Sequence, residues 1–255
     1  MADSVGVVHV HSAYSHDSRD SLASLREFAL ARDLRFVGLT DHAEDFDADK
    51  FAAYRAECAA LSDDRVTLIA GLEFRFEGYT GLHLLALGLT RWITPAKPAD
   101  FIADTRGVTR LIIAAHPVLF KYQMPDEVRA GIDAIEVWNA KYNTRYLPDP
   151  LAIRLLHAVR RTRPDVVGTV GLDQHDATND RKTRIIIDAA ASDPLAEIRA
   201  GRFQNRGLNM TFGPEVAWPV YGLPLLEATR FVFDRVEQVQ ERWAKRAKAK
   251  RTQAK

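Results

Sequence analysis

The chain has 255 residues, of which 47% are hydrophobic and 27% are charged, and its formal net charge is +1 at neutral pH. This composition suits a globular protein with a substantial core, and α/β barrels of one domain commonly reach this length. Seven basic and no acidic residues follow Glu241, so the preceding part carries 28 basic against 34 acidic side chains, a balance of −6. An acidic body with a short basic tail argues against a protein built around nucleic acid.

The chain carries no pattern that places it in an oxidising compartment or a membrane. Its one cysteine, Cys58, excludes an internal disulfide, and its first residues lack the charged and apolar regions of a secretory leader. No apolar run approaches the roughly 18 residues of a membrane span. We therefore expect a cytoplasmic protein with no membrane partner, and the oligomeric state stays open. We expect residues 1–241 to form one domain and residues 242–255 a disordered tail.

Short apolar runs rich in β-branched residues alternate with longer segments of helical period. In chain order, the predicted strands are Val5–Val10, Phe36–Leu39, Thr67–Leu72, His83–Leu89, Leu111–Ala115, Ala134–Val137, Val166–Val170 and Ile185–Ile187. The predicted helices are Ser21–Asp33, Ala48–Leu61, Ala99–Arg106, Pro150–Arg161, Pro194–Ala200 and a long C-terminal helix over Leu223–Ala249. Near-continuously apolar strands separated by helices predict a parallel sheet that is buried on both faces.

Potential metal ligands stand at the ends of five predicted strands. They are His9 and His11, Asp41 and His42, Glu73, His116, and Asp173 with His175. The C-terminal ends of parallel strands meet at one mouth, most completely in a barrel. Because strands spread across an open sheet would not bring five such ends together, the pattern favours a barrel. A further histidine, His83, begins a predicted strand, and its pattern fits a hydrogen-bonded loop residue as well as a role behind the ligands.

The types of these residues predict which ions they bind. Imidazoles and carboxylates without thiolates suit Zn, Mn or Fe as divalent ions. His9 and His11 are two residues apart in a strand, so they point the same way and both can reach one ion. Asp173 and His175 repeat this spacing. Because more than four candidate ligands converge, we expect two or three ions, with Glu73 able to bridge a pair.

Five segments together resemble the motifs of the PHP (polymerase and histidinol phosphatase) family. The first resembles its H-x-H motif and consists of His9-Val10-His11-Ser12 with Ser15-His16-Asp17. The others, in the family's order, are Thr40-Asp41-His42, Gly71-Leu72-Glu73, Ala115-His116-Pro117 and Gly171-Leu172-Asp173-Gln174-His175. The segment Ala196–Arg202 is also similar to one near the end of these domains. Each motif alone is weak, whereas five in order over Val5–Phe203 are strong.

The resemblance implies a distorted (β/α)7 TIM-like barrel with a metal site at the C-terminal strand ends. It implies one ion held by His9, His11, Glu73 and Asp173, a second held by Glu73 and His116, and a third to which His42 and His175 contribute. The further ligand of the first motif is either His16 or Asp17. The family's second histidine after Ala115-His116-Pro117 has no obvious counterpart, and Glu136 is the nearest replacement.

The function that follows is that of a metal-dependent phosphoesterase acting on a small phosphorylated substrate. The ions would activate water, and Asp173, His175 or His42 would shuttle the proton. Cations that follow strand ends are candidates for phosphate contact, namely Lys141, Arg145, Arg181, Lys182 and Arg184. One alternative is hydrolysis of a carbamate, ester or amide. The other is a non-catalytic, metal-stabilised binding module, against which the nearly complete ligand set argues. Contact with nucleic acid is expected at most through the basic tail.

Overall fold

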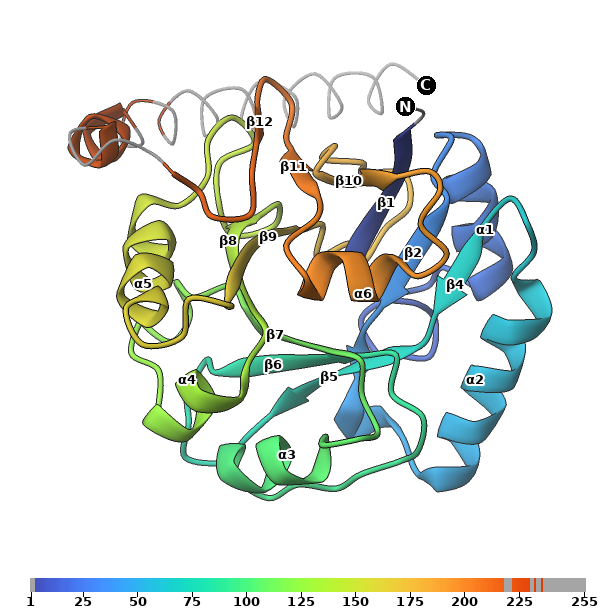
Figure 1. Cartoon of the computed structure of the whole chain (residues 1–255). Coiled ribbons are helices and arrows are strands. Elements are labelled where there is room, and N and C mark those ends of the chain that lie inside the picture. Colours follow the sequence, from blue (N-terminus) through green and yellow to red (C-terminus); the bar gives the residue numbers. More distant parts are fainter. Residues whose placement is uncertain (1–2, 218–221, 230–231, 233–234, 236–255) are drawn as a thin grey trace, which may run out of the picture.

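Two six-stranded sheets form the centre of the molecule, surrounded by helices (Figure 1). The computed structural model describes residues 3–217, 222–229, 232 and 235. One sheet has the spatial order β12 (Thr211–Phe212), β11 (Gln204–Arg206), β10 (Arg184–Asp188), β1 (Asp3–Val10), β2 (Phe36–Leu39) and β4 (Thr67–Ile69). The other has the order β3 (Asp41–His42), β5 (Gly71–Arg75), β6 (His83–Leu87), β7 (Leu111–Ala115), β8 (Ala134–Asn139) and β9 (Val167–Gly171).

Most helices pack on the outer faces of these sheets, whereas Leu195 and Ile198 of the last one join the apolar cluster in the interior. The helices are α1 (Leu22–Leu30), α2 (Ala48–Leu61), α3 (Pro98–Asp104), α4 (Asp126–Gly131), α5 (Pro150–Arg160) and α6 (Pro194–Arg199), with a 3₁₀ turn η1 (Ala43–Asp45). Apolar side chains from both sheets, such as Val8, Leu85, Ile113 and Ile185, pack together in the interior. A second and larger apolar cluster joins the outer strand faces to the helices. The predicted helix Ala48–Leu61 and the strands Phe36–Leu39 and Leu111–Ala115 are confirmed to the residue.

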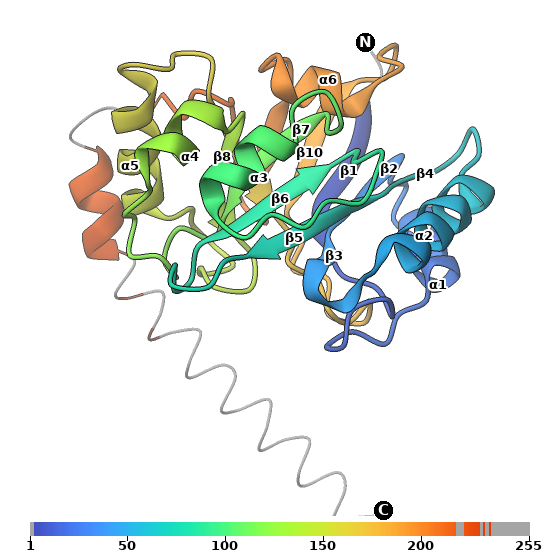
Figure 2. The same cartoon turned by 90° about the horizontal axis from the view of Figure 1, so that it is seen from below.

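The strand directions correct the predicted all-parallel sheet. Strand β6 runs antiparallel to both β5 and β7, and β10 runs antiparallel to β1. A short connection suffices between antiparallel neighbours, whereas parallel ones need a crossover of about a dozen residues or more. Figure 2 shows β5 and β6 side by side. As a consequence the first residue of β6, His83, is level with the last residue of β5, Arg75, and the last residue of β7, Ala115.

Two strands of the first sheet continue almost directly into strands of the second. The predicted strand Thr67–Leu72 is divided into β4 and β5 at Ala70, and β2 is followed by β3 after Thr40. Hydrogen bonds from Leu172 N to Val8 O (3.0 Å) and from His11 N to Gln174 O (2.9 Å) tie β1 to the segment after β9. The α/β class is confirmed. Over the described residues the strands form two mixed sheets and no closed barrel, so the sevenfold barrel stays a prediction.

The C-terminal part is described only in its first turns. Residues 222–229 are helical, as predicted, and Leu223 and Leu226 are buried against the core. The rest of the predicted helix to Ala249, apart from residues 232 and 235, lies outside the described residues. So do the domain boundary at residue 241 and the basic tail over residues 242–255. Helix α4 and strands β11 and β12 were not predicted. Within the described ranges, none of the helices has the length and apolarity to cross a membrane.

Candidate metal centre

The carboxylate of Glu73, in the middle of β5, lies among five imidazoles. Its Oε1 is 2.5 Å from His83 Nδ1 and 3.1 Å from His116 Nε2. Its Oε2 is 3.4 to 3.6 Å from nitrogen atoms of three further histidines, His9, His11 and His42. Glu73 is almost completely buried. One carboxylate thus faces different imidazoles with each oxygen, which is the arrangement of a ligand that bridges two ions.

The candidate ligands fall into three overlapping groups whose donor atoms lie within 4.8 Å of one another. The groups are His11, Asp17, His42 and His175; His9, Glu73 and His116; and His9, His11 and Asp173. Two ligand atoms that each lie about 2.0–2.2 Å from a tetrahedral zinc ion are roughly 3.3–3.6 Å apart. The distance of 3.8 Å from Asp173 Oδ1 to both His9 Nε2 and His11 Nε2 is only slightly larger. The spacing therefore fits ions between these side chains.

Several nitrogen atoms at the centre are buried without a hydrogen bond. Among the described residues these are His9 Nε2, both ring nitrogens of His11, and His116 Nδ1. A buried polar atom without a partner costs about 1–3 kcal/mol. A bound divalent ion takes up a lone pair from an imidazole nitrogen, so ions at these positions would remove part of that cost. The residues present therefore fit a cluster of metal ions.

Three of the candidate ligands have a strained backbone. His9, His116 and Asp173 have φ angles of +64°, +29° and +47°. Such conformations cost about 1–3 kcal/mol each in residues other than glycine and persist where the surrounding structure holds them. At His9 the strain accompanies an irregularity, because the pairing of β1 with β2 changes register between Val8 and Val10. His9 and His11 meet through this bulge and not through the regular alternation that their spacing suggested.

Glu136, which was predicted as a ligand, lies behind the histidines. Its Oε1 is 2.7 Å from His9 Nδ1, and its Oε2 accepts hydrogen bonds from His116 N (2.8 Å) and Asn139 Nδ2 (2.9 Å). A side chain on Gly171 would overlap the Glu136 carboxylate, so the glycine leaves room for it. Like His83, which is described below, Glu136 belongs to none of the three groups. A carboxylate at one ring nitrogen orients the other nitrogen toward a metal, and this position of Glu136 fits that role.

Asn139 extends this hydrogen bonding to the third strained residue. Its Nδ2 also donates to Asp173 Oδ2 at 3.1 Å, and its side chain is fully buried. The two residues on β8, hereafter the Glu136–Asn139 pair, therefore bond to His9, His116 and Asp173. These bonds hold the three strained residues in place from beneath.

His83 is the clearest residue of the site that the sequence left undecided. Its Nδ1 is in contact with Glu73, and its ring meets that of His116 edge-on with centroids 4.7 Å apart. Burial lowers the pKa of His83 despite the nearby Glu73 carboxylate. The reversed direction of β6 brings this first residue to the mouth, where last residues were expected. The place beside Glu73 and His116 that Glu136 was predicted to fill is therefore occupied by His83.

In the first motif, the structure brings Asp17 and not His16 into a group. Asp17 Oδ2 lies 3.1 Å from His42 Nε2 and 2.9 Å from His175 Nε2. His16 instead pairs with Asp45 at 2.8 Å, and 56% of its side chain is exposed. This geometry favours Asp17 as the further ligand.

Asp41 of the second motif organises the loop that carries Asp17. Its carboxylate accepts hydrogen bonds from Ser12 N (2.7 Å), Ser12 Oγ (2.8 Å) and Ser15 Oγ (2.8 Å). Ser15 Oγ in turn accepts from the backbone N–H of His42 at 2.8 Å. Asp41 is completely buried. It therefore fixes the loop relative to His42 without joining a ligand group.

The electrostatics keep the central carboxylates ionised. Burial by itself would raise the pKa of Glu73, but hydrogen bonds with His116 and His83 and the nearby charge of His9 hold it well below its usual range. Burial opposes ionisation of Asp173 too, and the positive charges of its neighbours still lower its pKa. Burial lowers the pKa of His11 well below its ordinary value. Burial opposes a charge on His9, but Glu136 and Asp173 raise its pKa well above the ordinary value. Because metal binds anionic carboxylates and neutral imidazoles, a bound ion would take the place of the His9 proton.

The predicted phosphate-binding cations take different positions. Lys141 Nζ lies 3.6 Å from Asp173 Oδ1 and 3.2 Å from His175 Nε2. Arg181 joins Lys141 in lining a small pocket of about 150 Å³ beside His175. Lys182, Arg184 and Arg145 do not line that pocket. The guanidinium of Arg184 is buried and bonds to Asp180 at 2.6 Å. Another cation, Arg75, which was not predicted, has Nη2 at 3.0 Å from His42 Nδ1.

One protein family and several solved structures are similar to this chain. The model of the PHP domain family matches residues 8–172. Among solved structures, a protein from Bifidobacterium adolescentis assigned as a metal-dependent phosphoesterase aligns with TM-score 0.48 and 16% identity, over 68% of this chain and 88% of that one. An amidohydrolase from Chromobacterium violaceum, with sulfate and no metal, aligns with TM-score 0.44 and 15% identity, over 78% of this chain and 96% of that one.

A third solved structure is that of Endonuclease Q in complex with a 27-mer duplex that carries an abasic lesion at its active site. It aligns with TM-score 0.51 and 16% identity, over 78% of this chain and 57% of that one. At this identity the likeness supports the fold alone. No curated protein matches the sequence significantly.

Proposed function

The chain belongs to the PHP domain family, and on that premise we propose that it is a metal-dependent phosphoesterase. Family membership and the clusters of His, Asp and Glu support a metal-dependent hydrolase that uses divalent ions. The observation that carries the proposal is the Glu73 carboxylate between imidazoles on both of its oxygens. We keep the distorted (β/α)7 barrel as part of the proposal, because β1 bonds to the segment after β9.

We assign the ligands from the distances around Glu73. One ion would be held by His9, His11, Glu73 and Asp173, and a second by Glu73, His83 and His116. The third would be held by Asp17, His42 and His175. This assignment replaces Glu136 by His83, because both oxygens of Glu136 already accept hydrogen bonds. His16 is left out because its imidazole pairs with Asp45.

Bound divalent ions would lower the pKa of a water molecule and neutralise charge on the phosphate oxygens. The chain's own side chains would orient the substrate and move the proton. Lys141 and Arg181 line the small pocket and are suited to contact phosphate oxygens. Asp173, His175 and His42 are the candidates for proton transfer. Of these, His175 is the most exposed, at 17%, and burial lowers its pKa, so in a form with two ions, in which His175 holds none, its neutral imidazole would be the one able to accept a proton.

The proposal is tested by the metal content of the purified protein together with hydrolysis of p-nitrophenyl phosphate and bis(p-nitrophenyl) phosphate in the presence of Mn or Zn. We expect two or three ions per chain. The variant Glu73→Gln should lose most of this metal and the activity, whereas Glu127→Gln, an exposed carboxylate on α4, should keep both.

Other outcomes would select the alternatives. Bound metal with hydrolysis of p-nitrophenyl acetate but of neither phosphoester would favour the carbamate, ester or amide hydrolase. Metal without turnover of any of these compounds would favour a binding module. If no metal binds after reconstitution with Zn, Mn or Fe, the central claim is wrong.

A further inference from the structure

Two pockets of different character flank the candidate metal centre. The small pocket described above, about 150 Å³, contains Lys141, Arg181 and the proposed ligand His175. The amide of Gln174 also lines it, and neither the nitrogen nor the oxygen of this buried amide has a hydrogen-bond partner in the described structure. The other pocket, hereafter the aromatic pocket, measures about 540 Å³ and includes Phe46, Phe74, Phe76 and Trp92 among its lining residues.

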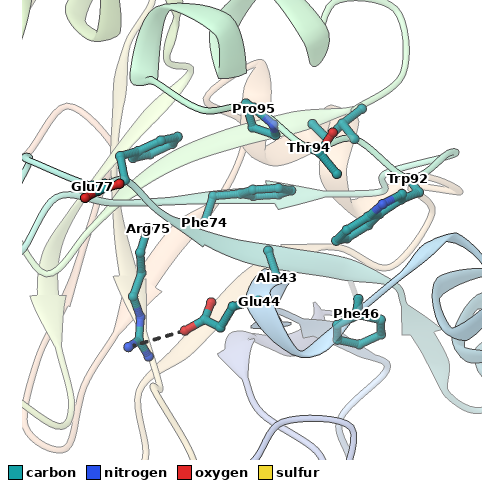
Figure 3. A pocket seen from close by; sticks show the side chains of 11 residues that line it. Ala43, Glu44, Phe46, Phe74, Arg75, Glu77, Trp92, Thr94 and Pro95 are labelled. Carbon is teal, nitrogen blue, oxygen red and sulfur yellow. Dashed lines mark ion pairs between the residues drawn. The ribbon is translucent and has the colours of Figure 1, made fainter.

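The aromatic pocket begins directly beside a proposed ligand. Ala43 and Glu44, which follow His42 in the chain, form part of its wall. Arg75 also lines it, with Nη2 at 3.0 Å from His42 Nδ1 and Nη1 at 3.4 Å from Glu44 Oε1. Figure 3 shows Arg75 and Glu44 joined at one side of the pocket, with Phe74 between Arg75 and Trp92. A substrate bound at the ions would therefore reach this pocket past Arg75.

Rings on three segments give the aromatic pocket a fixed shape. Phe46 follows η1, Phe74 lies on β5, and Trp92 lies in the connection from β6 to α3. The rings of Phe46 and Trp92 have centroids 6.4 Å apart, and Phe74 packs against Phe101 of α3 at 5.1 Å. Because these contacts hold the rings, the pocket is formed before any ligand enters. Its volume lies within the roughly 300–1,000 Å³ usual for small-molecule sites.

The charges of the two pockets determine which end of a bound phosphoester lies at which pocket. The aromatic pocket has two carboxylates in its lining, Glu44 and Glu77, and one cation, Arg75, which pairs with Glu44. This lining does not favour an anion. The small pocket offers Lys141 and Arg181 and has too little volume for more than a phosphate-sized group. The phosphoryl group is therefore favoured at the small pocket, with the rest of the substrate on the opposite side of the centre.

We propose that the substrate is a phosphoester with a planar, uncharged aromatic leaving group that binds in the aromatic pocket. This inference rests on the proposed function and specifies its substrate. Hydrolysis breaks the P–O bond to the leaving group, and water supplies a hydroxyl to phosphorus and a proton to the released alcohol. Arg75, between the pocket and His42, contacts the ester at the bond that breaks. Aromatic rings in the wall favour a planar group through stacked and edge-on contacts.

The test compares benzyl phosphate with ethyl phosphate in the metal-loaded protein, because both release an unactivated primary alcohol and differ mainly in the ring. We expect kcat/KM to be at least about tenfold higher for benzyl phosphate, the factor that corresponds to one good aromatic contact. Trp92→Ala should lower kcat/KM for benzyl phosphate about tenfold, mainly through KM, and leave ethyl phosphate within about twofold. Trp92→Phe should restore most of the loss. Leu151→Ala, an exposed side chain on α5, is the control.

Inhibition provides a readout without turnover. Benzylphosphonate should compete better than ethylphosphonate, and Trp92→Ala should remove that difference. Equal kcat/KM for the two esters in the parent protein, or an equal loss for both in Trp92→Ala, would overturn this inference while leaving the phosphoesterase in place. If the metal-loaded protein hydrolyses no phosphoester at all, the proposed function is wrong and this inference falls with it.

Discussion

The two sides of the candidate metal centre are built differently. On the side of β1, β8 and β9, the Glu136–Asn139 pair is fully buried and bonds to three strained residues. On the side of β3 and the loop after β1, the ligand candidate Asp17 is 32% exposed and Arg75 is 43% exposed. One side consists of strands held by internal hydrogen bonds, and the other includes residues in a loop and at a strand end that face solvent.

This difference separates two tasks of a metal-dependent enzyme. Buried, strained ligands with fixed hydrogen bonds keep one geometry whether or not an ion is bound, so they favour tight and permanent binding. Exposed residues can move when substrate enters. The cations Lys141 and Arg75, which contact Asp173 and His42, are 41% and 43% exposed and belong to this mobile class. We therefore expect substitutions beneath the centre to affect stability and metal retention, and substitutions on the open side to affect the last ion and the substrate.

The largest effect should come from adding one methyl group on the buried side. A Cβ at position 171 would overlap Glu136 Oε1, so Gly171→Ala must displace the carboxylate or the strand. We expect a loss of about 1–3 kcal/mol or more in the free energy of unfolding, measured in urea, together with loss of metal. The double variant Gly171→Ala with Glu136→Ala should recover part of that stability, because the overlap is gone. If Gly171→Ala is as stable as the parent and retains its metal, the Glu136–Asn139 pair is not held rigidly.

The next largest effect is expected from a substitution that removes the charge of Glu136 and keeps the shape of its side chain. Glu136→Gln keeps the volume but replaces one carboxylate oxygen, so either His9 Nδ1 or the donors at Oε2 lose an acceptor. Outer partners of metal-bound histidines typically contribute about 10- to 100-fold to metal affinity, and we expect a loss in that range by competition with a chelator. Glu127→Gln on α4 serves as the control. Unchanged affinity would place Glu136 outside the machinery that orients His9.

The sequence predicts where the strands of the site lie better than it predicts their direction or their backbone strain. The apolar runs mark the strands well, since β2 and β7 have the predicted bounds, and the residues after them assemble around Glu73. An apolar run that is buried on both faces looks the same in either direction, however. The reversal of β6, and with it the position of His83, was therefore not visible. The positive φ angles of His9, His116 and Asp173 depend on tertiary hydrogen bonds, which no local pattern records.

A moderate effect on stability is expected from Asp41, which holds the loop after β1 on the open side. Asp41→Asn replaces an oxygen that accepts hydrogen bonds from Ser12 and Ser15 with an NH₂ group. Because the group is buried, we expect the free energy of unfolding to fall by about 1–3 kcal/mol. The loop after β1 should loosen, so that the weakest-bound ion is lost first in a chelator titration while the ions at Glu73 are retained. Asp45→Asn, which changes a less buried carboxylate of η1, should have the smaller effect on stability. The opposite order would mean that Asp41 does not anchor the loop.

The smallest and most selective effect separates the two neighbours in the first motif. Asp17→Asn removes the charge that faces His42 and His175 at 3.1 and 2.9 Å. We expect binding of the ion between these residues to weaken by about tenfold or more, since a carboxamide is a poorer ligand for divalent ions than a carboxylate. The other ions and the melting temperature should change little, because Asp17 is partly exposed. His16→Ala should leave every ion in place, because its ring pairs with Asp45 on the solvent side. If His16→Ala loses an ion and Asp17→Asn does not, then the loop rearranges on metal binding, and the open side is even less preorganised than its hydrogen bonds indicate.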